Sequence, residues 1–168
     1  MIKSACVFAA LIGMNPMVAA GELLLAGRVE SILLLPSGSE HCPRLSGSAS
    51  NADGTQHVSI SNDGGCQQAS IRVSRTLLGK PQQQTITIVT RLGEWSQPSL
   101  PLQANDILIY ADADAVRWSA LEQKNGATFF EAQPFTSVGG VKIASLPHDG
   151  DGLVPLASLV DKFNTSAQ

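Results

Sequence analysis

The feature that most constrains the fold is a series of short segments in which apolar and polar residues alternate. In residues 22–35, alternate positions place these side chains on one face: Leu23, Leu25, Gly27, Val29 and Leu33. A period of two residues predicts a strand, and a glycine inside it predicts a bulge or a close backbone approach. Further segments of this kind are 67–77, 84–92, 106–113, 116–121, 128–130 and 141–145. The sequence therefore predicts a mainly β protein.

One core is expected to join these strands in a closed or nearly closed barrel. Its predicted inward residues are Leu25, Val29, Ile71, Val73, Ile86, Ile88 and Ile109. The segment 106–113 differs from the others, because an almost unbroken apolar run predicts a strand covered on both faces. The turn residues Lys124-Asn125-Gly126 predict a hairpin that leads to Phe129.

The C-terminal end changes from a strand pattern to a helical one. Apolar residues recur at helical spacing in 152–163: Leu153, Leu156, Leu159, Val160 and Phe163. This stripe predicts a short helix, with Pro155 in its first turn. Because so short a helix is marginal alone in water, we expect it to dock on the open end of the barrel. Residues 21–168 are assigned to a single domain.

The first twenty residues have the pattern of a secretory signal peptide. A basic start at Lys3 precedes an apolar run, and Val18-Ala19-Ala20 supplies the small residues of a cleavage site. Cleavage after Ala20 would leave Gly21 at the N-terminus of a periplasmic or secreted protein. The alternatives are a retained anchor and lipidation at Cys6. The apolar run is shorter than the roughly 20 residues that a membrane-spanning helix needs.

The charge distribution limits the classes of partner. The formal net charge is −3, and the basic residues are scattered along the chain. Nucleic-acid binding needs a basic stripe, so it is not expected. The sequence also predicts no cofactor and no transmembrane segment after cleavage.

Two cysteines, Cys42 and Cys66, remain after removal of the leader. In an oxidising compartment such a pair predicts a disulfide, which would tie together the ends of a long loop. The alternatives are two free thiols and a metal or redox site that also involves His41 and His57. No standard metal-ligand spacing supports the metal site.

Three strand segments resemble those of a known family. Leu25-Ala26-Gly27-Arg28-Val29 resembles the opening apolar-x-Gly-x-Val strand of the netrin-like domains, which include the tissue inhibitors of metalloproteinases. Residues 71–79 resemble their x-V-x-x-x-L-K-G strand and turn, and residues 106–111 their G-x-x-Y-L-V-F-A strand.

The resemblance covers roughly residues 21–132. It implies an all-β, OB-fold-like five-stranded Greek-key barrel. The inhibitors present an N-terminal cysteine to a protease zinc, whereas Gly21 would stand first here. The resemblance therefore transfers no inhibitory residue and implies no activity.

Several polar residues are candidates for catalysis or metal binding. Asp149-Gly150-Asp151-Gly152 resembles part of a calcium-binding loop. No Glu follows at the position where such a loop needs one, so we favour a turn before the helix. The carboxylates Asp112 and Asp114 are interpreted as a solvated strand end rather than as a catalytic pair. No nucleophile motif is present. No catalytic or metal-binding residue is therefore assigned.

An aromatic residue in a loop gives the remaining candidate site. Trp95 stands beside Glu94 in a proline-containing loop, and exposed aromatic residues favour recognition. Trp118 is expected in the core instead. The leading hypothesis is an exported, non-enzymatic module that binds another protein or an envelope component. The alternatives are a small hydrolase with an unrecognised site and a structural subunit of an envelope assembly.

Overall fold

The computed structural model describes residues 21–44, 64–81, 83–92, 99–102, 105–112 and 115–166. Its strands are β1 (Leu23–Leu35), β2 (Cys66–Leu78), β3 (Thr85–Arg91), β4 (Ile107–Ala111), β5 (Val116–Lys124), β6 (Ala127–Glu131), β7 (Ser137–Val138), β8 (Val141–Lys142) and β9 (Leu153–Pro155). A 3-10 turn, Ile143–Ser145, and one α-helix, α1 (Leu156–Ser166), complete the described elements. The mainly β prediction is confirmed. The expected leader, 1–20, lies outside the described residues.

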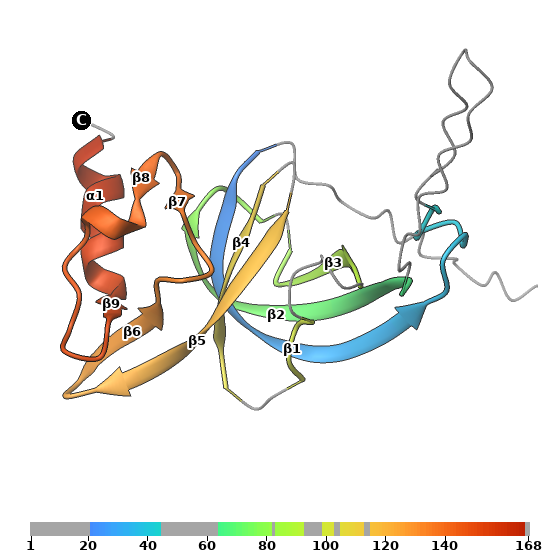
Figure 1. The fold of residues 1–168 in the computed structure, drawn as a ribbon, viewed down its shortest axis with the longest axis horizontal. Coiled ribbons are helices and arrows are strands. Elements are labelled where there is room, and N and C mark those ends of the chain that lie inside the picture. The colour runs from blue at the N-terminus through green and yellow to red at the C-terminus, as the bar shows by residue number, and fades with distance from the viewer. Residues whose placement is uncertain are drawn as a thin grey trace, which may run out of the picture.

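Most strands form one antiparallel sheet in the order β3-β2-β1-β4-β5-β6-β9, and β7 and β8 form a separate hairpin (Figure 1). Helix α1 and the C-terminal strands lie at one end of the molecule, and the far ends of β1 and β2 lie at the other (Figure 1). The part of the chain that the structure describes contains no helix long and apolar enough to cross a membrane.

Strand β1 follows the predicted alternation only as far as Val29. Its register with β2 runs from Val29 opposite Ile71 to Ser31 opposite Ser70, so Glu30 is an extra, bulged residue. A bulge reverses which positions face the core. Ile32 therefore packs against the core, and Leu33 is 57% exposed. The prediction that Leu33 points inward is wrong for this reason.

Gly27 lies at another irregularity of the β1–β2 pairing, where Ser74 of β2 is the extra residue, and at a close backbone approach, which the sequence predicted. The register shifts between Ala26 and Gly27. A Cβ atom placed on Gly27 would lie only 2.7 Å from the carbonyl oxygen of Arg72. Any larger residue would therefore push β1 and β2 apart at this point.

Strand β4 is buried on both faces, as its continuous apolar sequence predicted. Alternate residues enter two separate clusters: Ile107 and Ile109 enter one, and Leu108 and Tyr110 enter the other. We call the cluster that contains Ile107 and Ile109 the inner core, and the cluster that contains Leu108 and Tyr110 the outer core. The sheet thus separates two hydrophobic layers where the sequence predicted one core.

The inner core is shared by the first five strands. Its buried residues are Leu23, Leu25, Val29, Ala69, Ile71, Leu100, Ile107 and Ile109. Val73, Ile86, Ile88 and Trp118 pack against it and are partly buried. All seven predicted inward residues therefore contact this core, and Trp118 is a core residue as expected. Strands β3 and β5, which end this row of five, reach the same cluster, so the sheet must curl around it.

The curl does not close into a barrel. Among the described residues, β3 pairs only with β2, and the row continues beyond β5 into β6 and β9. The closed five-stranded barrel is therefore not confirmed, and the sheet is open. Strand β5 changes neighbour along its length: Val116–Ala120 pairs with β4, and Leu121–Lys124 pairs with β6.

The outer core holds the C-terminal elements against the sheet. Its buried residues are Leu24, Leu108, Tyr110, Phe130, Phe135, Val138, Ile143, Leu146, Val154, Leu156 and Leu159. Helix α1 contributes Leu156 and Leu159, and Phe163 packs alongside. The helix docks as predicted, but it packs against the outer core and does not plug the inner one. It also begins later than predicted, because Leu153–Pro155 forms β9 and pairs with β6.

Candidate functional site

The predicted recognition residues Trp95 and Glu94 lie outside the described residues, as do His57 and Asp114. The structure therefore places neither member of the candidate binding pair. The other sequence candidates that the structure describes include Cys42, Cys66, Asp112 and the acidic loop 149–152.

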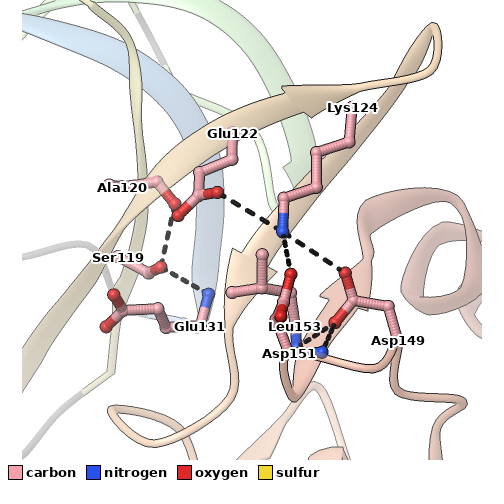
Figure 2. Close-up of polar contacts among 8 residues, drawn as sticks. All are labelled: Ser119, Ala120, Glu122, Lys124, Glu131, Asp149, Asp151 and Leu153. Carbon is pink, nitrogen blue, oxygen red and sulfur yellow. Dashed lines mark hydrogen bonds and ion pairs between the residues drawn. The ribbon is translucent and has the colours of Figure 1, made fainter.

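The acidic loop surrounds a lysine side chain. The Lys124 ammonium lies 2.8 Å from Asp151 Oδ2, 3.5 Å from Asp149 Oδ2 and 3.8 Å from Glu122 Oε2 (Figure 2). Two of these carboxylates, Asp149 and Asp151, come from the loop, and Glu122 comes from β5. The side chain of Lys124 supplies the positive charge itself, and the loop is joined to the β5–β6 hairpin by this contact.

Hydrogen bonds within the loop help to define its shape. Asp149 Oδ1 accepts the backbone N–H groups of Asp151 at 2.9 Å and Leu153 at 2.8 Å (Figure 2). The bond from Leu153 is the largest cause of a lowered pKa at Asp149. The hydrogen bond to Asp151 is the largest cause of a raised pKa at Lys124. Both shifts reflect interactions that favour the charged forms, and the loop is an ion-paired turn. The sequence predicted a turn directly before a helix, whereas β9 follows the loop.

A buried hydroxyl supports the same hairpin. Ser119 is 2% exposed, accepts the backbone N–H of Glu131 at 2.8 Å and donates to the carbonyl of Ala120 at 2.9 Å (Figure 2). It lies where β5 passes from β4 to β6. A buried serine there satisfies a backbone group that the change of partner would otherwise leave unpaired.

Asp112 has a structural environment at the β4–β5 turn. Its carboxylate accepts the backbone N–H of Ala115 at 2.8 Å and a hydrogen bond from Arg117 at 2.9 Å. These contacts close the turn. Asp112 follows β4 as expected for a strand end, but its side chain is only 22% exposed and is ion-paired with Arg117 rather than solvated.

A serine–aspartate contact lies near the start of β4. The Ser74 hydroxyl lies 2.5 Å from Asp106 Oδ2 and 3.0 Å from the carbonyl oxygen of Ala26. Arg28 Nε lies 3.8 Å from the other Asp106 oxygen. The hydroxyl has a single proton, so Ser74 of β2 donates to one of these acceptors at a time, either Ala26 of β1 or Asp106 just before β4. Sequence reasoning missed this contact because its members are far apart along the chain.

Tyr110 is the buried titratable group of the outer core. It is 3% exposed, and its pKa is raised from 10.0 to about 12. Burial is the largest cause, followed by the hydrogen bond to the Glu22 carboxylate and by the negative charges of Glu22 and Asp112. Each of these disfavours a phenolate. The hydroxyl of Tyr110 therefore stays protonated at neutral pH.

Two surface depressions lie among the described residues. One shallow, open depression is lined by residues 73–76, 81, 83 and 84, and another by residues 131–133 and 151–153. Neither lining contains a histidine or a cysteine. In the described part of the chain, no group of three or more His, Cys, Asp or Glu side chains is arranged to hold a metal ion.

The far end of β1 carries exposed apolar side chains. Leu33 and Leu34 are 57% and 69% exposed, and we call these two residues the distal leucine patch. They pair with Gln68 and Gln67 of β2, so their neighbours across the two-stranded β1–β2 ribbon are polar. Successive residues of a strand point to opposite faces, so the patch presents an apolar side chain on each side.

A disulfide anchors the chain next to this patch. Cys42 and Cys66 lie at bonding distance, with 5.7 Å between their Cα atoms, which is consistent with the predicted bridge. Both cysteines are buried, and Cys66 pairs with Leu35 at the end of β1. Arg91 of β3 adds a hydrogen bond to the carbonyl oxygen of Pro43 at 2.6 Å. His41 is exposed beside the bridge.

Comparison with known proteins gives no relative. No protein-family model, curated protein or solved structure matches the chain.

Proposed function

We propose that this chain is an exported, non-enzymatic module that binds another protein through the distal leucine patch. The observation that carries the proposal is that Leu33 and Leu34, consecutive residues near the end of β1, are both largely exposed, one on each face of the strand. Single exposed apolar residues are ordinary on protein surfaces, whereas two in succession on a strand offer a partner apolar contact on both faces.

The surroundings of the patch suit a binding role. The ribbon that bears it is fixed at its end by the pairing of Leu35 with Cys66 and by the disulfide of Cys66 with Cys42. A rigid support lowers the conformational entropy lost when a partner binds. Two leucines on opposite faces would fit a partner that grips the ribbon from both sides.

The order of the first five strands supports a fold related to the OB barrel. The antiparallel strands β3-β2-β1-β4-β5 share the inner core, which is compatible with a five-stranded, partly open barrel of the OB type. OB-type domains bind oligonucleotides and oligosaccharides with the β2–β3 face and the β1–β2 and β4–β5 loops, so the fold suggests a location for binding and not a protein partner. The distal leucine patch leads directly into the β1–β2 connection. This is an argument from fold, and the exposed leucines carry the functional proposal.

Export rests on the leader pattern and on the paired cysteines. Disulfides persist mainly in oxidising compartments, so the geometry of Cys42 and Cys66 is compatible with a periplasmic or secreted location. Mass spectrometry of the protein from its native cells tests this directly. A mature chain that begins at Gly21 is expected, and a chain that retains residues 1–20 would contradict export by cleavage.

Site-specific photo-cross-linking tests the binding surface. A photoreactive residue placed at Leu34 is expected to capture a discrete protein in the native cells. The matched control is Leu102, which is 66% exposed and outside the ribbon. Capture of the same protein from both positions, or from neither, would contradict the distal leucine patch as the binding surface.

A further inference from the structure

We draw no further inference here: the strongest candidate, the distal leucine patch of Leu33 and Leu34 at the end of β1, already belongs to the proposed binding surface, and nothing among the described residues shows what covers it.

Discussion

Strand β1 contains the same three-residue sequence, Leu-Leu-Leu, at both of its ends. In the first triplet, Leu24 and Leu25 are fully buried and Leu23 is 7% exposed. In the second, 33–35, two leucines are largely exposed and the third is half-buried. The side chains are identical, and both triplets lie in one continuous strand. The difference therefore comes from what surrounds each end.

Neighbouring strands and layers explain the contrast. The first triplet lies between β2 and β4, with the inner core on one face and the outer core on the other. The second triplet pairs with β2 and ends opposite Cys66. Hydrophobic burial holds one end of β1, and a covalent bridge lies beside the other. The exposed leucines of the second triplet are the surface for which we propose a binding role.

The largest effect is expected at the first triplet. Leu24→Ala removes a side chain from the outer core, and Leu25→Ala removes one from the inner core. Each is expected to lower the free energy of unfolding by about 2–5 kcal/mol, through lost burial and the cavity that remains. Urea denaturation measures both. A cost below about 1 kcal/mol for either variant would mean that the corresponding core is loosely packed.

Removal of the disulfide tests what holds the other end. The bridge joins residues 24 apart, and the chain-entropy estimate for such a loop is about 3 kcal/mol. We expect the Cys42→Ser/Cys66→Ser double variant to lose stability on that scale. Hydrogen exchange should accelerate more at 31–35 than at 23–27. The double variant should not respond to reductant, which provides the control, and equal acceleration at both ends would contradict the contrast.

Titration to alkaline pH tests whether Tyr110, in the outer core beside the first triplet, is buried in solution. Tyr110 pairs with Leu24 and is the one tyrosine of the chain, so the ultraviolet absorbance of phenolate reports on it alone. Its pKa is about 12 in the folded protein against 10.0 for an exposed tyrosine. Between these values the unfolded chain loses the proton and the folded chain keeps it, so stability falls as the pH rises. The shift corresponds to about 2–3 kcal/mol.

Tyr110→Phe is the matched control for this titration. The variant keeps the ring and removes the ionisable group, so its stability should fall less than that of the original protein from about pH 10 to about pH 12. Identical pH profiles, or an absorbance midpoint near 10, would show that the hydroxyl is solvated and the outer core is open there.

Sequence patterns predicted the elements better than their arrangement. Alternation located the long strands, and the Asn125-Gly126 turn has the positive φ angles of the predicted hairpin. The side on which Leu33 lies was missed because the bulge at Glu30 depends on the register with β2. The contact of Lys124 with Asp151 spans 27 positions, and no local pattern encodes it. The proposed roles of Trp95 and Glu94 stay predictions.

The smallest effect on stability is expected at the second triplet, where the effect on binding should be largest. Leu34→Ser exchanges an exposed apolar side chain for a polar one, so the free energy of unfolding should change by no more than about 0.5 kcal/mol. The same variant should strongly reduce the protein captured by a photoreactive residue at position 33. Leu102→Ser, at almost the same exposure, should leave both quantities unchanged. If Leu34→Ser cost as much as Leu24→Ala, the second triplet would be buried in solution. The contrast between the two ends of β1 would then fail together with the proposed binding surface.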